Sequence, residues 1–156
     1  RYPVLKRAFL FSCLTGLRKS DIQKLTWGEV QKFGKYTRIV FKQRKTKGQE
    51  YLDISSQAEK YLGERGNPDD IVFTGFTYGS WTSLELQRWS LAAGVNKNLT
   101  FHCGRHTFAV LMLDLGADIY TVSKLLGHRF LTTTQIYAKV LDKNKQNAVS
   151  LIPDIG

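Results

Sequence analysis

The fold of this chain is decided by one stretch, residues 100–116, with the sequence TFHCGRHTFAVLMLDLG. Its pattern predicts a helix with Thr100 as the N-cap and a buried body, because its second half is almost entirely apolar. His102, Arg105 and His106 lie at positions i, i+3 and i+4, so they share one face near the helix N-terminus. Unpaired N–H groups and the helix dipole favour an anion there. We therefore expect a helix whose body is buried and whose N-terminal end binds phosphate.

Length and charge narrow the class of protein. The chain has 156 residues, which fits one domain with a core of its own. It carries 23 Lys and Arg against 13 Asp and Glu, which indicates a polyanion as partner, with solubility alone as the alternative. Cys13 and Cys103 are too few and too distant for a disulfide framework, which favours an intracellular, cytoplasmic setting. No apolar run approaches the roughly 20 residues of a membrane span, so no membrane partner is expected.

Outward from residues 100–116, helical and extended patterns alternate. Helices are predicted at residues 3–14, 20–25, 55–62, 78–93 and 118–126, followed by a helical turn at 132–137 and a mostly polar helix at 139–152. The second of these helices opens with a capping box at residues 20–23. Strands at 36–43 and 49–54 form a hairpin, and a short strand follows at 71–73. The prediction is an α+β domain that is mainly helical, with a small antiparallel sheet.

Basic residues stand at two exposed bends of this predicted fold. Arg18 lies in a tight corner between two helices, with Asp21 three residues on and able to hold its guanidinium. The alternative is a structural role in which Arg18 caps the preceding helix. The hairpin tip carries Arg44, Lys45 and Lys47, which on composition alone are solvated turn residues.

Five motifs follow one another along the chain: TGLRKSDI at residues 15–22, Lys45 at the hairpin tip, His-x-x-Arg-His at 102–106, LLGH at 125–128, and Tyr137. In order and spacing they resemble the catalytic domain of the tyrosine recombinases, the phage-integrase family. Each motif alone is weak, but five in register are hard to obtain by chance. The similarity covers essentially the whole chain, so it implies one catalytic domain over residues 1–156, without the family's N-terminal core-binding domain.

The resemblance implies a site-specific recombinase, or integrase, that cleaves and rejoins DNA. Tyr137 would be the nucleophile that forms a 3′-phosphotyrosyl link, and Arg18 and Arg105 would clamp the scissile phosphate. Lys45 would protonate the 5′-oxygen leaving group. These roles agree with the chemistry of the side chains, because the arginine fork matches phosphate geometry and phosphoryl transfer depends on positioning and electrostatic stabilisation.

Further polar residues receive supporting roles from the same resemblance. His102 would assist proton transfer at Tyr137, and His128 would hydrogen-bond the phosphate. Asp21 matches the family's acidic residue after the first arginine, which orients its neighbours. His106 matches a frequent family histidine, for which we expect a structural or orienting role.

Two positions do not match the family pattern in a simple way. Arg44 and Lys47 compete with Lys45 for the acid role, and we choose Lys45 because the family's lysine stands the same distance before the second strand. Gly104 stands where the family often has leucine, which we expect to loosen local packing without removing a chemical group.

No cofactor is implied, because a phosphotyrosyl ester stores the energy of the broken bond and lets a DNA hydroxyl reverse the reaction without ATP or metal.

Three alternative functions compete with the recombinase. A helical metal pair of His102 and His106 is the first alternative, but the zinc hydrolase pattern places glutamate where Cys103 stands, and no third ligand is evident. A type IB topoisomerase and a DNA-binding module with an inert tyrosine are the others. The family's topoisomerase relatives usually lack the histidine at position 102.

The implied partner is double-stranded DNA, bound by a homotetramer of the full-length protein with accessory DNA-bending proteins. A prokaryotic, cytoplasmic location is expected. Residues 141–156 form a C-terminal tail, and we predict that Ala148, Val149, Leu151 and Ile152 dock on a neighbouring protomer.

Overall fold

A computed structural model describes residues 3–41, 51–127 and 131–156. Their elements, in order, are α1 (Pro3–Thr15), α2 (Lys19–Lys24), the 3-10 turn η1 (Trp27–Glu29), β1 (Val30–Phe33), β2 (Tyr36–Val40), β3 (Tyr51–Ile54), α3 (Ser56–Glu59), α4 (Ser80–Ala92), α5 (Cys103–Asp114), α6 (Ile119–Leu125), η2 (Leu131–Val140) and α7 (Leu141–Ser150). The mainly helical α+β class is confirmed. Within these residues, no helix is both long enough and apolar enough to cross a bilayer.

The larger core is built around α1, whose Phe11 is completely buried. Phe9 of the same helix meets Trp89 of α4 and Phe101 edge to face, with ring centroids 5.9 and 5.8 Å apart. Helix α1 also packs along α5, where a Cβ atom on Gly104 would lie only 2.9 Å from the Cβ of Ser12. Gly104 therefore allows a close helix crossing, and the expected loosening of packing at this position is wrong.

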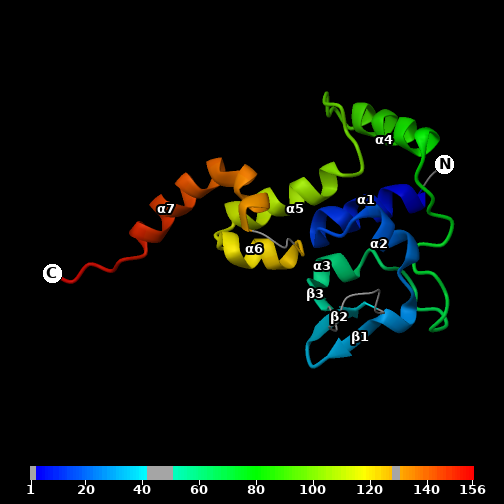
Figure 1. The fold of residues 1–156 in the computed structure, drawn as a ribbon, viewed down its shortest axis with the longest axis horizontal. Helices are drawn as coiled ribbons and strands as arrows, with labels where there is room; N and C mark the ends of the chain where they lie inside the picture. Colours follow the sequence, from blue (N-terminus) through cyan, green and yellow to red (C-terminus); the bar gives the residue numbers. More distant parts are fainter. Residues whose placement is uncertain (1–2, 42–50, 128–130) are drawn as a thin grey trace.

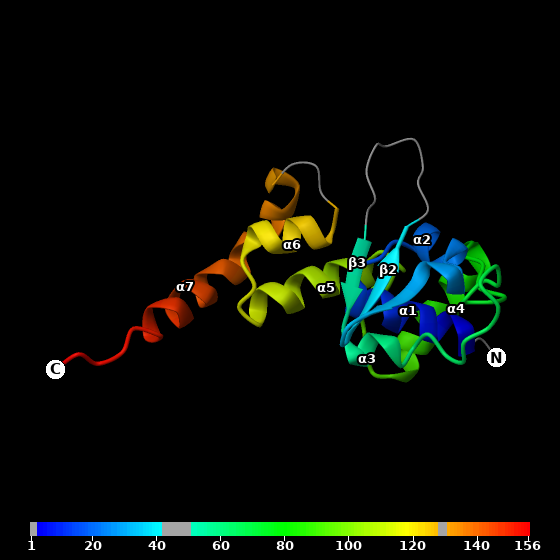
Figure 2. The same cartoon turned by 90° about the horizontal axis from the view of Figure 1, so that it is seen from below.

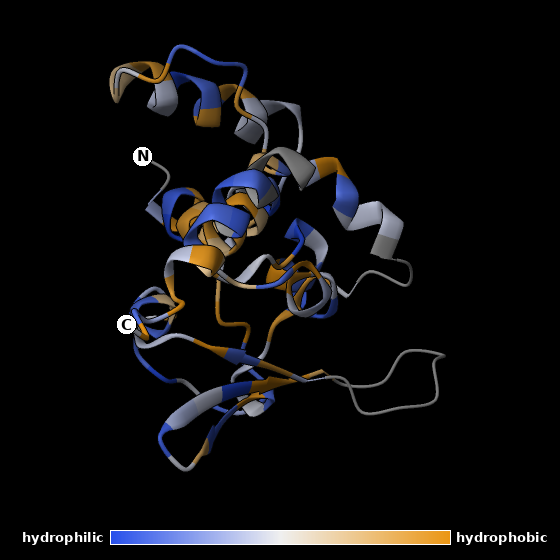
Figure 3. Ribbon diagram, turned by 90° about the vertical axis from the view of Figure 1, so that its left-hand side faces the viewer, coloured by the Kyte–Doolittle hydropathy of each residue, from blue (hydrophilic) through white to orange (hydrophobic). Residues whose placement is uncertain are grey.

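The sheet is antiparallel, with strand order β1-β2-β3. Its inner face packs into the larger core through Val30, Ile39 and Leu52, which lie opposite one another across the strands. Figure 3 shows hydrophobic and hydrophilic segments following one another along these strands. The hairpin prediction is confirmed for β2 and β3, and β1 is an additional strand. The strand predicted at 71–73 is wrong, because only Ile71 forms a bridge, with Thr26.

A second, smaller core joins α5 to the elements that follow it. Its buried members are Phe108, Ala109, Leu113, Val122 and Leu126, and Tyr137 packs against them. Helix α7 and the C-terminus project away from the sheet, on the side of the molecule opposite α4 (Figures 1 and 2). Helix α5 thus connects the larger core to the segment that carries the tyrosine.

Helix boundaries near the predicted site differ from the sequence expectations. Helix α5 begins at Cys103, after a tight turn in which the Cys103 N–H donates to the Thr100 carbonyl at 3.0 Å, so Thr100 is not its N-cap. Helix α2 begins at Lys19 with Arg18 as N-cap, so the capping box at residues 20–23 is wrong. The sequence also predicts Asp118 as the N-cap of the helix at 118–126, and this is confirmed, because its carboxylate accepts from the Thr121 N–H at 2.8 Å.

Candidate active site

The turn after α1 fixes the position of Arg18. Gly16 has a left-handed backbone (φ 76°), and the Ser12 hydroxyl donates to the Leu17 carbonyl at 2.7 Å. The Leu17 N–H donates to the Thr15 hydroxyl at 3.3 Å. These bonds are buried, whereas Arg18 itself is exposed and has an extended backbone. A rigid turn therefore presents an arginine whose guanidinium is accessible.

Arg105 is the buried member of the arginine pair, with 7% of its surface exposed. Its guanidinium donates to the Gly16 carbonyl at 2.8 Å and to the Leu126 carbonyl. Both carbonyls lie at helix C-termini, those of α1 and α6, where main-chain acceptors lack helical partners. The capping role considered for Arg18 thus belongs to Arg105.

The same contacts leave Arg105 able to bind an anion. A guanidinium has five N–H donors, and these two bonds use two of them. Burial and the Arg18 charge lower the pKa of Arg105, while Asp21 and Tyr137 act in the opposite direction. An arginine side chain stays protonated in proteins, so two positive charges face one another here. An anion between them would relieve this repulsion.

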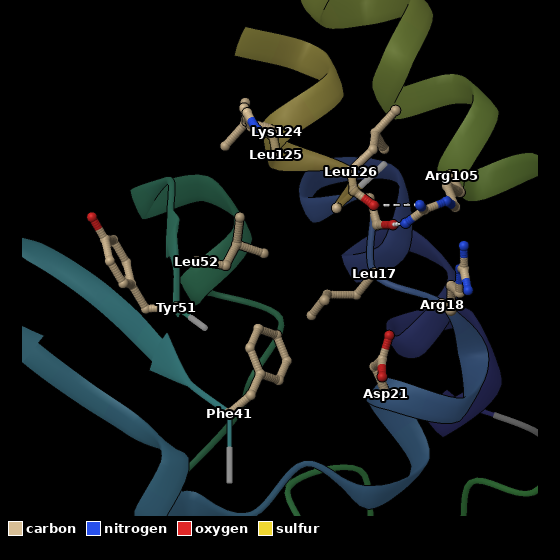
Figure 4. Close-up of a pocket in the computed structure, with 12 residues that line it drawn as sticks. Leu17, Arg18, Asp21, Phe41, Tyr51, Leu52, Arg105, Lys124, Leu125 and Leu126 are labelled. Carbon is tan, nitrogen blue, oxygen red and sulfur yellow. Dashed lines mark hydrogen bonds between the residues drawn. The ribbon is translucent and has the colours of Figure 1, made fainter. Parts of the chain in front are cut away.

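Arg18 and Arg105 line one cavity of about 500 Å³ between the helices and the sheet (Figure 4). The rest of its wall is formed by Gly16, Leu17, Asp21, Phe41, Tyr51, Leu52, Lys124, Leu125, Leu126 and Gly127. The Asp21 carboxylate lies 3.4 Å from Nζ of Lys24, so it forms an ion pair within its own helix. The structure thus brings Arg18 and Arg105 to the wall of one cavity.

Two predicted site residues, Lys45 and His128, lie outside the described residues, as do the alternatives Arg44 and Lys47. The residues that lead to them border the cavity, however. Phe41, which follows β2, and Tyr51, the first residue of β3, form part of its wall, and so does Gly127. Both predicted residues are therefore close in sequence to the cavity lining.

The histidines of α5 form a short chain of contacts that reaches Tyr137. The rings of His102 and His106 are perpendicular, with centroids 4.6 Å apart. Nδ1 of His106 is hydrogen-bonded to the Tyr137 hydroxyl. His102 instead lines a smaller cavity of about 240 Å³ that also includes Arg18 and Arg105. Of the two histidines, it is His106 that contacts the tyrosine. Within the described residues, no group of three potential ligands could hold a metal ion.

Burial favours the neutral forms of both His102 and Tyr137. Burial, followed by the charges of His106, Arg105 and Arg18, lowers the pKa of His102. Burial raises the pKa of Tyr137, and the Arg105 charge partly opposes this. The phenol is therefore protonated at neutral pH, and it must give up its proton before or during an attack on phosphorus.

Tyr137 lies at a kink in η2, where its backbone is not helical (φ −95°, ψ 15°). The ring packs against the smaller core, and the hydroxyl points to α5. Sequence reasoning found this tyrosine but missed Lys124, which adds a third positive charge to the cavity wall. Its position directly before the LLGH motif at 125–128 is the one signal that pointed to it.

Comparison with known proteins agrees with the family resemblance of the sequence motifs. The phage integrase family model matches residues 3–144. The chain is 34% identical over 134 residues to tyrosine recombinase XerC of Actinobacillus pleuropneumoniae serotype 7 (strain AP76), covering 79% of this chain and 43% of that protein. It is 33% identical over 140 residues to XerD of Oceanobacillus iheyensis, covering 81% of this chain and 46% of that protein. The chain thus spans less than half the length of these curated relatives.

Solved structures share the fold. The XerH site-specific recombinase, bound to its palindromic difH substrate in a post-cleavage complex, aligns with a TM-score of 0.68 at 20% identity, covering 94% of this chain and 45% of that chain. The catalytic domain of bacteriophage HP1 integrase aligns with a TM-score of 0.61 at 23% identity, covering 97% of this chain and 90% of that chain. Motifs, fold and family model agree, and this chain belongs to the phage integrase family.

Proposed function

We propose that this protein is a site-specific DNA recombinase, or integrase, that cleaves and rejoins double-stranded DNA through a 3′-phosphotyrosyl intermediate, without metal or ATP. The observation that carries the proposal is the convergence of Arg18 and Arg105 on one cavity, with Tyr137 hydrogen-bonded to His106 on the same helix as Arg105. The named XerC and XerD relatives and the DNA-bound XerH structure support the same activity.

The arginines stabilise the charge that develops on the phosphate. Arg105 is held by two carbonyls, so its charge does not need to reorganise when the phosphate enters, and a rigid turn presents the exposed Arg18. The Tyr137 oxygen gives its proton to a histidine of α5 as it bonds to phosphorus, and the bond from phosphorus to the 5′-oxygen breaks. Lys45 gives the 5′-oxygen its proton, and His128 hydrogen-bonds the phosphate. A 5′-hydroxyl then attacks the tyrosyl ester to rejoin a strand.

Recombination joins two duplexes, so we propose a homotetramer of the full-length protein on DNA, with accessory DNA-bending proteins, in the prokaryotic cytoplasm. The end of α7 and the residues after it support this assembly, because Val149, Leu151 and Ile152 are 67%, 82% and 71% exposed. Apolar side chains this exposed gain free energy when a neighbouring protomer covers them. Deletion of residues 146–156 should abolish synapsis of two DNA duplexes in a gel-shift assay, and unchanged synapsis would refute the docking.

A nicked suicide DNA substrate, from which the 5′ fragment diffuses away after cleavage, tests the chemistry. The protein should form a covalent adduct visible on a denaturing gel, and Tyr137→Phe should form none. Tyr36→Phe, at an exposed residue of β2, is the matched control and should keep the adduct. An inert DNA-binding module would shift the DNA but trap no adduct with any variant.

A further inference from the structure

The hydrogen bond between His106 and Tyr137 joins two residues that the sequence gives no reason to pair. They are 31 residues apart, their ring centroids are 5.7 Å apart, and Nδ1 of His106 contacts the phenol oxygen itself. That oxygen is the atom that would attack phosphorus. A contact to the attacking atom constrains the reaction more directly than any contact to the tyrosine ring does.

His106 is well placed to define where the phenol oxygen lies. It belongs to the first turns of α5, next to Arg105, which is fastened to the ends of α1 and α6. The His102 ring packs against it at 4.6 Å. Tyr137, in contrast, lies at a backbone kink. A fixed imidazole therefore restrains a side chain whose own backbone is irregular.

We propose that His106 is a positioning residue for the proposed cleavage reaction, and that its Nδ1 atom holds the Tyr137 hydroxyl in line for attack. The inference rests on the proposed function. A neutral imidazole with its proton on Nε2 accepts the phenol O–H at Nδ1, which orients the oxygen lone pairs away from the histidine. His102, to which family resemblance gives the role at Tyr137, lies instead in the smaller cavity with Arg18 and Arg105.

Two conservative substitutions separate the two ring nitrogens. In His106→Asn the side-chain amide occupies roughly the place of Nδ1, whereas in His106→Gln the amide reaches the place of Nε2. Single-turnover cleavage of the suicide substrate at saturating DNA is the readout, with DNA affinity measured in parallel. We expect His106→Gln to lose about 100-fold in rate with unchanged DNA affinity, because small displacements of a reacting group have effects of this size. His106→Asn should keep most of the rate.

Every other pattern overturns the inference. A His106→Gln variant that is as fast as His106→Asn or faster means that Nδ1 is not the contact that matters, and so do two variants that are equally slow or both unimpaired. If the unsubstituted protein forms no adduct, the proposed function fails. If it does and both His106 variants cleave normally, only this inference fails.

A second measurement needs neither DNA nor a histidine variant. The chain has three histidines, so the nitrogen NMR resonances of each can be assigned in the full chain. The Nδ1 resonance of His106 should move when Tyr137→Phe removes the hydroxyl. A resonance that stays in place in Tyr137→Phe would show that the two side chains are not paired in solution and would overturn the inference.

A substrate with sulfur in place of the bridging 5′-oxygen distinguishes the role of His106 from that of Lys45, the proposed acid. The thiolate leaves without protonation, so this substrate should restore cleavage to Lys45→Ala. It should not restore cleavage to His106→Gln, because the leaving group has no influence on where the nucleophile lies. Full rescue of His106→Gln would place the histidine with the leaving group and contradict the proposal.

Discussion

The arginine corner, residues 16–18 with Arg105, and the tyrosine segment, residues 131–140, are held in place by very different means. Arg105 is 7% exposed and tied to two main-chain carbonyls, and the space around Gly16 is filled by Phe108. The tyrosine segment has a kink at Tyr137, and its neighbour Ile136 is 69% exposed. The buried Arg105 is therefore part of the core, whereas Tyr137, the proposed nucleophile, lies in a segment with an irregular backbone.

This difference suits the proposed chemistry. Electrostatic stabilisation is most effective when the charges are fixed before the reaction begins. A nucleophile that must attack, stay bonded to DNA and leave again gains from a more adaptable support. Helix α7 is anchored to α5 by an exposed ion pair between Lys143 and Asp114 at 2.7 Å, a type of contact that contributes little to stability.

The largest effects should come from the two arginines, and they should differ. Arg105→Gln and Arg18→Gln should each slow cleavage of the suicide substrate on the order of 100- to 1,000-fold, since each removes a charge from the phosphate. Only Arg105→Gln should also destabilise the fold, by about 1–3 kcal/mol for each buried carbonyl left without a donor. Urea unfolding measures this term.

The control for the arginine pair is Arg88→Gln, because Arg88 is exposed on α4 and pairs only with Glu85 among the residues described. It should change neither rate nor stability. Equal unfolding midpoints for Arg105→Gln and Arg18→Gln would erase the distinction between a buried and an exposed arginine.

Next in size is the substitution Gly16→Ala. The new Cβ would meet Phe108 at 2.6 Å, and the backbone is left-handed (φ 76°). Strain and overpacking together should cost about 2–4 kcal/mol of unfolding free energy. Gly94→Ala is the matched control, since Gly94 has a similar angle (φ 80°) with nothing within 4 Å of the new atom. It should lose only the backbone part, about 1–2 kcal/mol, and equal losses in the two variants would show that the corner is loosely packed.

A smaller effect is expected for Gly104→Ala, where two terms oppose each other. Alanine is favoured over glycine in a helix by about 1 kcal/mol. The added Cβ would lie 2.8 Å from the hydroxyl of Ser12, on a helix that cannot move freely, and overpacking costs about 1–3 kcal/mol. We expect net destabilisation in thermal unfolding, and a raised melting temperature would mean that α1 and α5 separate easily.

The smallest effect is a pH dependence at His102. Its pKa is lowered in the folded protein from 6.5 by burial and by the charges of His106, Arg105 and Arg18, so the unfolded chain binds more protons. Stability is then fully present above about pH 6.5 and is lost as the pH falls through the lower, folded value. His102→Gln should lose less stability between pH 7.5 and pH 5 in urea titrations. A parallel loss in both proteins would contradict this.

Sequence patterns predicted the elements whose apolar residues face the core at regular spacing. Helix α1, the β2 and β3 pair and the Asp118 cap follow from such local rules. Strand β1 was missed because only Val30 of its four residues is buried, so no alternation is visible. Residues 71–73 were mistaken for a strand because Val72 and Phe73 are apolar, but they are apolar because they fill the core.

The motifs named Arg18 and Arg105, and the structure brings both to one cavity, but the motifs did not predict how these residues are connected. The bond from Arg105 to Gly16 spans 89 residues and that from His106 to Tyr137 spans 31. Such pairs depend on how helices pack in three dimensions, and local periodicity carries no information about them.

One measurement tests the central claim, that the cavity lined by Arg18 and Arg105 binds the phosphate that Tyr137 attacks. The adduct trapped on the suicide substrate is digested with protease, and mass spectrometry identifies the residue that carries the DNA 3′-phosphate. The expected result is modification of Tyr137 alone, lost when Arg18 and Arg105 are both replaced by glutamine. Modification of any other residue, or an adduct that persists without both arginines, would contradict the account.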